Sequence, residues 1–267
     1  MTAGPTGGSP GPGARVMVNR LVAAVAVPVA LAHIALTGKV RPGSAGRTAA
    51  AWARLVGRLT GVTFQAAGRL GPASGTMRVL VANHSSPLDI AALLAVEPDL
   101  TFVAAAELFR VPLLAAAMRA LRTVPVDRRS RSGVHLELPP GLAGPGLALA
   151  VFPEGGIAPP GRRLPFRRSP FALAVGHGAT LVPVAIHSSE RALPPRSRLG
   201  VRPGTVTVEF LPPIPTAGRG MADRWELCEM AERRIARALS DRAAEGPGRP
   251  VTARPEGIVP APEGQAA

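Results

Sequence analysis

One stretch of the sequence, residues 79–90, reads Val-Leu-Val-Ala-Asn-His-Ser-Ser-Pro-Leu-Asp-Ile and decides the fold around it. It continues a mostly apolar run that begins at Met77, and Pro87 then opens a second apolar segment, Leu88 to Val96. A short apolar run that ends in polar residues predicts a buried strand, and proline is well placed where a helix begins. We therefore expect a strand, a turn and a helix over residues 77–96.

His84 and Asp89 are the residues of this stretch with catalytic potential. A histidine directly after a strand lies where the strand ends of an open α/β sheet form a crevice. Asp89, in the first turn of the expected helix, can accept the proton of one ring nitrogen, which leaves the other nitrogen as a general base. From these two residues alone, a turn histidine followed by a helix-capping aspartate remains an alternative.

The chain offers no convincing nucleophile of its own. Its single cysteine, Cys228, lies in a charged helical pattern, and the one Gly-x-Ser-x-Gly match, residues 7–11, stands in a Gly/Pro-rich segment without a preceding strand. A His/Asp pair without a protein nucleophile is expected to deprotonate a hydroxyl group of the substrate itself. One cysteine also excludes an intramolecular disulfide and fits a reducing compartment.

The composition indicates a protein at a membrane surface or with a single anchor. Hydrophobic residues make up 46% of the chain, yet no run of 18 is uninterrupted. The formal net charge of +14 requires anionic surroundings, and aromatic residues at 3%, without tyrosine, leave little for stacking on bases. Anionic lipid is therefore favoured, and we expect no nucleic acid partner. Because Lys39 is the only lysine, arginine-rich coding bias is an alternative source of the charge.

The chain divides into four parts. Residues 1–14 and 246–267 are Gly/Pro-rich and predict disordered tails, residues 15–60 predict membrane-associating helices, and residues 61–245 predict the α/β domain. Within the second part, Leu21–Leu36 is apolar, flanked by basic residues and expected to be broken at Pro28. Whether it spans the membrane, lies on it or is a signal peptide stays open at this point.

Strand and helix patterns alternate along the domain. This alternation predicts an α/β fold with a mixed, mostly parallel sheet flanked by helices. Pro183 predicts an edge strand or a bulge, and residues 130–146 predict a short helix followed by an irregular connection. The expected strands are 62–66, 77–82, 100–104, 122–126, 147–152, 180–187 and 205–211, and the expected helices are 88–96, 107–121, 166–177 and 223–244.

Four motifs follow one another along residues 79–186. Asn83 to Asp89 contains Asn-His-x4-Asp, residues 124–128 read Val-Pro-Val-Asp-Arg, residues 152–155 read Phe-Pro-Glu-Gly, and residues 182–186 read Val-Pro-Val-Ala-Ile. Together they resemble the glycerolipid acyltransferase family, of the lysophosphatidic acid (1-acyl-sn-glycerol-3-phosphate) acyltransferase type. The resemblance implies transfer of a fatty acyl group from acyl-CoA or acyl-ACP, as co-substrate, to the free hydroxyl of a lysophospholipid.

The resemblance also implies roles for individual residues. His84 and Asp89 would be catalytic, and Arg128 would bind an anionic group of the acceptor, because a guanidinium meets a phosphate bidentately. The other residues implied in substrate binding are Asn83, Glu154, Gly155 and Gly156. We expect no metal and no bound cofactor, with membrane lipid, the lysophospholipid and acyl-CoA or acyl carrier protein as partners at the cytoplasmic face of the cell membrane.

The chain departs from the family pattern at its basic positions. Ile157 stands where the family usually has a phosphate-binding arginine, and Ala105 stands where it often has a lysine. The family's Phe-Lys-x-Gly appears as residues 166–169, Phe-Arg-Arg-Ser. Arginine at 162, 163, 167 or 168 could replace the lost charge. Otherwise the acceptor is a different lipid, such as a lyso-aminolipid, or the chain is a non-catalytic lipid-binding relative.

Overall fold

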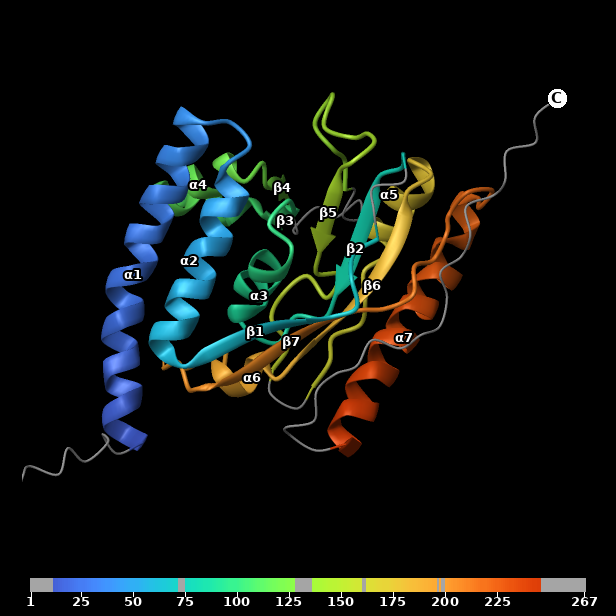
Figure 1. The fold of residues 1–267 in the computed structure, drawn as a ribbon. Coiled ribbons are helices and arrows are strands. Elements are labelled where there is room, and N and C mark those ends of the chain that lie inside the picture. Colours follow the sequence, from blue (N-terminus) through green and yellow to red (C-terminus); the bar gives the residue numbers. More distant parts are fainter. Residues whose placement is uncertain are drawn as a thin grey trace, which may run out of the picture.

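The computed structural model describes residues 12–71, 75–127, 136–159, 162–195, 197 and 200–245. Seven strands form one sheet in the order β1-β7-β6-β2-β5-β3-β4 (Figure 1). All neighbouring pairs are parallel except β6 and β7. The expected mixed, mostly parallel sheet is therefore confirmed. The strands are β1 Val62–Ala67, β2 Arg78–Ala82, β3 Thr101–Ala105, β4 Val124–Val126, β5 Ala148–Val151, β6 Thr180–His187 and β7 Gly204–Phe210.

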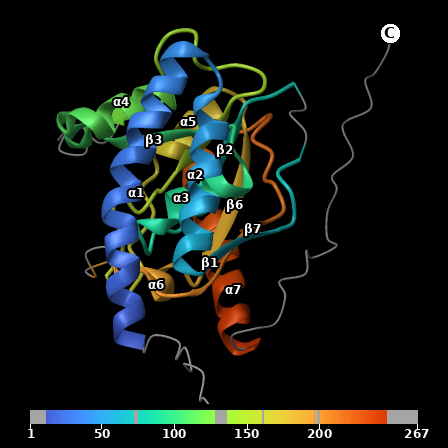
Figure 2. The ribbon, with the colours of Figure 1, turned by 60° about the vertical axis from the view of Figure 1, so that its left-hand side comes forward.

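Helices cover both faces of the sheet. One face carries α2 and α3, with α1 outside α2, whereas α5 and α7 lie on the other face (Figures 1 and 2). Helix α4 packs against α1 beside the β3–β4 edge. The helices are α1 Pro12–Val40, α2 Ala45–Thr60, α3 Leu88–Val96, α4 Pro112–Ala120, α5 Ser169–Gly176, α6 Ser189–Ala192 and α7 Arg224–Glu245, with short 3₁₀ turns at Ala106–Arg110 and Met221–Asp223.

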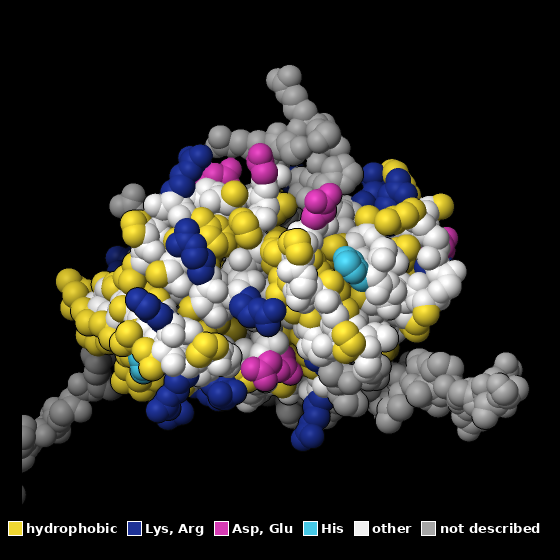
Figure 3. Space-filling model, turned by 90° about the horizontal axis from the view of Figure 1, so that it is seen from above, with side chains coloured by type: hydrophobic (Ala, Val, Ile, Leu, Met, Phe, Trp, Pro, Cys, Tyr) yellow, Lys and Arg dark blue, Asp and Glu magenta, His cyan; other side chains and the backbone are white. Residues whose placement is uncertain are grey.

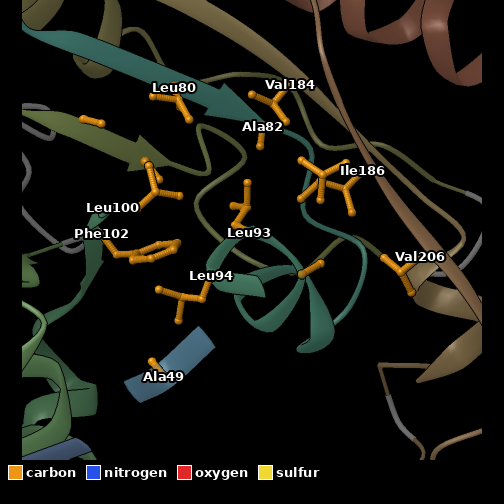
Figure 4. Close-up of a cluster of buried hydrophobic side chains, with 14 of the residues drawn as sticks. Ala49, Leu80, Ala82, Leu93, Leu94, Leu100, Phe102, Val184, Ile186 and Val206 are labelled. Atoms are coloured by element: carbon orange, nitrogen blue, oxygen red, sulfur yellow. The ribbon is translucent and has the colours of Figure 1, made fainter. Parts of the chain in front are cut away.

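Strand β2 lies at the centre of the sheet and is buried on both faces. Leu80 and Ala82 point to the α3 side, where Leu93 and Phe102 meet them (Figure 4). Val79 and Val81 point to the other side, toward α5 and α7. A strand covered on both faces needs apolar residues at every position, which explains why this run reads as continuous rather than alternating.

Helix α1 is continuous through Pro28, so the expected break there is wrong. Its segment Val16–Val40 is long and apolar enough to cross a membrane, and only 17% of its most apolar window is buried in the protein. Asn19 nevertheless fixes the helix to the domain, because its side-chain amide donates to the carbonyl oxygens of Thr60 and Val201, both at 2.9 Å. The helix therefore presents apolar side chains outward while one side of it packs on the domain.

Two further expectations about helices need correction. The helix expected over residues 107–121 is two elements, because Pro112 forces the residue before it, Val111, into an extended conformation and then starts α4. Helix α1 begins at Pro12, inside the segment expected to be a disordered tail. Residues 136–146, the described part of the expected helix and connection at 130–146, contain no helix, and the two predicted tails otherwise lie outside the described residues.

Pro183 lies in the interior of the sheet, so its expected place on an edge strand is wrong and the bulge is right. Strand β6 pairs with β2 on one side and with β7 on the other. Between the pairs Val184↔Phe210 and Leu181↔Ile214, two residues of β6 face three residues of the neighbouring segment. The extra residue creates a bulge at the position where proline has no N–H to donate.

Candidate active site

Two loops meet at the carboxyl ends of β2 and β5. The strands are parallel neighbours, and Val81 is paired with Val151. The residues that follow each strand by the same distance therefore lie side by side, and these are His84 and Glu154. Glu154 Oε1 accepts a hydrogen bond from the backbone N–H of His84 at 2.8 Å. The pairing of β2 with β5 thus brings together two motifs that are 70 residues apart.

Asp89 holds the His84 ring. Its Oδ2 lies 2.8 Å from His84 Nδ1 and also accepts the backbone N–H groups of Ser85 and Ser86 at 2.8 and 2.9 Å. Because an ionised carboxylate only accepts, Nδ1 carries the proton and Nε2 is left as the basic nitrogen. The carboxylate is fully buried in the first turn of α3, where the helix dipole favours negative charge.

The other side of His84 is fixed by packing. The Phe152 ring stacks on the imidazole with centroids 4.0 Å apart and an angle of 17° between the planes. The His84 carbonyl accepts the backbone N–H of Ala158 at 2.8 Å, which joins the histidine turn to the Phe-Pro-Glu-Gly turn. The side chain is 12% exposed, so the ring is confined but reachable.

Glu154 is a buried carboxylate that organises the two turns. Oε1 binds the backbone of His84, and Oε2 accepts the backbone N–H of Leu164 at 3.3 Å. Burial raises the pKa of Glu154 above the ordinary value, and the two backbone hydrogen bonds and the nearby His84 partly oppose this rise. The bonds described here are all within the protein, so a role of Glu154 in substrate binding stays a prediction.

Asn83 joins β2 to β6. Its Nδ2 donates to the Ile186 carbonyl at 3.0 Å, and its Oδ1 accepts the Ile186 N–H at 2.8 Å. The side chain is buried, and its two hydrogen bonds continue the pairing of β2 with β6 just past the end of β2 at Ala82. Substrate contact by Asn83 stays a prediction, whereas its positioning of the residue before His84 is observed.

His84 forms part of the wall of an apolar cavity of about 360 Å³. The floor is built by side chains of β3, α3 and α4, and helix α1 closes one side through Leu31 and Ile34. Gly155, Gly156 and Arg167 also line it, and they lie close to His84 because Gly155 follows Glu154, which is bonded to the His84 backbone, and contacts Arg167. A cavity of this kind accepts a long apolar group and places one end of it beside the imidazole.

At two positions around this cavity, this chain has an apolar residue where the family usually has a basic one. Ala105 lines the wall, and Ile157 is half-buried in the turn after Glu154. Arg167 lies against Gly155, whose φ of +72° is easily adopted only by glycine and where a Cβ atom would come 2.5 Å from Arg167 Nε. Among the described residues, no carboxylate forms an ion pair with the Arg167 guanidinium. The predicted Arg128 lies outside the described residues.

Two contributors to the site were not anticipated from the sequence. Phe152 belongs to a recognised motif, but its stacking on His84 depends on the pairing of β2 with β5. Leu31 and Ile34 come from the N-terminal helix, which sequence patterns assign to the membrane rather than to the cavity wall. No local signal identifies either contact, because both are made across large separations in the chain.

The comparisons with known proteins agree with this fold. The fold is that of the crystal structure of the 1-acyl-sn-glycerophosphate (LPA) acyltransferase PlsC from Thermotoga maritima, with a TM-score of 0.64 and 21% identity, over 86% of this chain and 96% of that one. Residues 72–187 match the family model Acyltransferase. The fold is thus an α/β acyltransferase fold, and residues 72–187 carry the match to the family model.

Relatives in sequence narrow the assignment. The chain is 30% identical over 171 residues to a chloroplastic 1-acyl-sn-glycerol-3-phosphate acyltransferase of Brassica napus, covering 63% of this chain and 48% of that protein. It is 32% identical over 145 residues to the alpha enzyme of the same name from Mus musculus, covering 52% of this chain and 50% of that protein. These similarities support the lysophosphatidic acid acyltransferase family for this chain, which spans about half the length of the relatives it matches.

Proposed function

We propose that the protein transfers a fatty acyl group from a thioester, acyl-CoA or acyl-ACP, to the free hydroxyl of a lysophospholipid. The proposed acceptor is 1-acyl-glycerol-3-phosphate, which would give phosphatidate. One observation carries the proposal: an imidazole held by a buried carboxylate at 2.8 Å forms part of the wall of an apolar cavity. The names of the relatives support the same reaction class.

The proposed reaction needs one proton shuttle. His84 Nε2 takes the proton of the acceptor hydroxyl as its oxygen attacks the thioester carbonyl, and Asp89 stabilises the imidazolium that forms. The tetrahedral intermediate collapses with formation of the ester and cleavage of the carbon–sulfur bond. The imidazolium then returns its proton to the departing thiolate. No acyl group is bound to the protein in this sequence of steps.

Membrane association supplies the lipid substrates in this proposal. Large apolar side chains of α1 and α2 are exposed, among them Leu21, Val25 and Leu55. Seen from above, hydrophobic side chains gather at the margin on the α1 side, with Lys and Arg side chains across the adjoining face (Figure 3). Apolar and basic groups side by side suit the surface of an anionic bilayer. Because CoA and acyl carrier protein thioesters are cytoplasmic, we place the domain at the cytoplasmic face.

Arg167 supports an acceptor with an anionic headgroup. It lies at the His84 end of the cavity without a carboxylate partner among the described residues, where a guanidinium can bind a phosphate through two hydrogen bonds. Ile157 and Ala105 support a second candidate, the same chemistry on another lyso-lipid, because both remove a cation that the family usually has. A lyso-aminolipid is one such acceptor.

The proposal is tested by incubating the full-length protein with acyl-CoA or acyl-ACP and a mixed lyso-lipid extract, followed by mass spectrometry of the lipids. The expected result is a new diacyl lipid with the parent protein and its loss with the His84→Ala variant. A His84→Ala variant that transfers acyl groups as well as the parent would contradict the proposed base. A parent protein without transfer to any acceptor would favour a non-catalytic lipid-binding relative.

A further inference from the structure

A second hollow of about 530 Å³ runs along one side of α5, and we call it the α5 groove. One wall is α5 itself, and the facing walls come from residues 136–138 and from the start of α7. Its polar character distinguishes it from the apolar cavity at His84. The residues that line it are Leu136, Glu137, Leu138, Arg168, Ser169, Ala172, Leu173, Gly176, His177, Met221 and Arg224.

The α5 groove follows the whole length of its helix. Its residues on α5 and directly after it, at positions 169, 172, 173, 176 and 177, have the spacing of one helical face. Eight residues of helix extend over about 12 Å. Ser169, Ala172 and Gly176 are small, so this face leaves room for an extended ligand. The groove is therefore shaped for a narrow chain rather than for a compact group.

The α5 groove adjoins the reaction cavity. Leu136 and Ser169 line both hollows. A thioester whose acyl chain fills the apolar cavity has its carbonyl carbon beside His84, and the part beyond the sulfur must leave the cavity. The α5 groove provides a polar way out at Ser169, at the end of the cavity where Arg167 and Gly156 lie. The apolar cavity is thus suited to the acyl chain of a thioester, and the polar groove to the part beyond the sulfur.

Two arginines and one glutamate line the α5 groove. Arg168 and Arg224 line it together with His177, and Glu137 is the acidic residue in its wall. The Arg168 guanidinium lies over the ring of Trp225, and Arg224 donates to the Met221 carbonyl. Among the described residues, neither arginine forms an ion pair with a carboxylate. Two guanidiniums at a narrow groove, with no ion-pair partner in the part of the chain that the structure describes, are suited to a phosphate.

From these observations we infer that the α5 groove binds the phosphopantetheine arm of the acyl donor, with Arg168 and Arg224 at its phosphate. The inference rests on the proposed function for the identity of the ligand as an acyl thioester. Acyl-CoA and acyl-ACP share this arm, so the groove recognises the chemistry common to both. The acyl chain extends into the apolar cavity, and the arm lies along α5.

A kinetic test compares the Arg168→Ala/Arg224→Ala variant with the parent. We expect the KM for acyl-CoA or acyl-ACP, whichever the parent uses, to rise about tenfold or more, with the KM for the lysophospholipid unchanged. The KM for S-acyl-pantetheine, which has no phosphate, should stay the same in both proteins. Arg233→Ala, on an exposed part of α7, is the matched control. An equal rise for S-acyl-pantetheine, or no rise for the phosphorylated donor, would overturn the inference.

A steric test uses Gly176, at the end of α5 remote from Ser169 and so near the far end of the α5 groove. A Cβ atom there would meet the Met221 Cε at 3.5 Å, an ordinary contact, so Gly176→Ala should be accommodated. Gly176→Leu should fill the groove and raise the KM for the donor at least as much as the arginine variant does. If Gly176→Leu binds the donor as Gly176→Ala does, the arm follows another path and the inference is wrong.

A binding test separates this inference from the proposed function. Trp225 is 48% exposed beside Arg168, so its fluorescence in a Trp52→Phe background reports occupation of the groove. We expect 4′-phosphopantetheine and CoA to change this fluorescence and pantetheine to do so only at much higher concentration. A His84→Ala variant should bind equally well. If the parent protein binds these ligands but transfers no acyl group, the groove inference stands and the proposed function is wrong. If it transfers acyl groups but binds phosphopantetheine no better than pantetheine, the proposed function stands and the groove inference is wrong.

Discussion

His84 Nδ1 and Asp89 Oδ2 lie 2.8 Å apart, and the same oxygen also accepts the backbone N–H groups of Ser85 and Ser86. The carboxylate thus fixes the turn and the ring at once. Asp89 Oδ1 is buried without a hydrogen-bond partner among the described residues. All the observed hydrogen bonds of the carboxylate therefore go to residues 84–86, the turn that carries the imidazole.

Replacing Asp89 by Asn should leave the fold in place and remove most of the activity. An amide oxygen can still accept backbone N–H groups, but the side chain no longer carries the charge that stabilises the imidazolium. We expect kcat to fall roughly 10²- to 10⁴-fold, the range of positioned acid–base catalysis. Steady-state kinetics together with circular dichroism would measure it. A folded Asp89→Asn variant with parental kcat would show that the aspartate only caps the helix.

Asn83→Ala tests whether this residue serves structure or substrate. Without the amide, the N–H and C=O of Ile186 lose their partners in a buried place, which costs about 1–3 kcal/mol per unsatisfied group. We expect the free energy of unfolding to fall by about 2 kcal/mol or more. Denaturant unfolding measures this loss. If the KM for the acceptor rises while stability is unchanged, the predicted role in substrate binding is right.

Arg167→Gln should change the choice of acceptor. Loss of a charge-assisted pair of hydrogen bonds is expected to raise the KM for lysophosphatidate about tenfold or more and to leave the KM for neutral monoacylglycerol unchanged. Addition of Ile157→Arg should restore part of the loss by returning a cation to the usual family position. Arg163→Gln, in the same loop but not in the cavity wall, is the control. A uniform effect on both acceptors would show that Arg167 only shapes the turn.

Glu154 should give the protein a characteristic dependence of stability on pH. Burial raises its pKa in the native state, so its stabilising contribution is complete below the ordinary pKa of 4.5 and is lost as the pH rises through the higher native pKa. The difference in Tm between the parent and Glu154→Gln should therefore become smaller, or more negative, as the pH rises above 4.5. Thermal unfolding of both proteins across this range measures it. A difference that grows with pH would contradict the raised pKa.

Cys228 should react slowly in the native protein. Burial, together with the charge of Glu232, raises the pKa of the thiol to about 11 from an ordinary 9.0. At pH 8 this lowers the thiolate fraction about a hundredfold, and the thiolate is the reactive form. Because Cys228 is the only cysteine, reaction with a disulfide reagent in native buffer and in guanidinium gives a direct comparison. Equal rates in the two solvents would show that the thiol is accessible.

The sequence by itself determined the parts of the site that are local. Five residues separate His84 from Asp89, and a strand that ends in a turn before a helix brings them together without help from distant segments. The Phe-Pro-Glu-Gly turn and the apolar run of β2 are local in the same sense, so both could be predicted. The class of the fold followed from the alternation of strand and helix patterns.

Only the tertiary structure decided which distant segments meet. The order of the strands brings β5 beside β2, and this places Glu154 and Phe152 against His84. The same order put Pro183 at a bulge inside the sheet rather than at an edge, and the packing of α1 made Leu31 part of the cavity wall. Such contacts depend on the summed packing of whole elements, which no short pattern encodes. Catalytic residues that lie within a few positions of each other can therefore be predicted from the sequence, whereas the cavity around them depends on the tertiary fold.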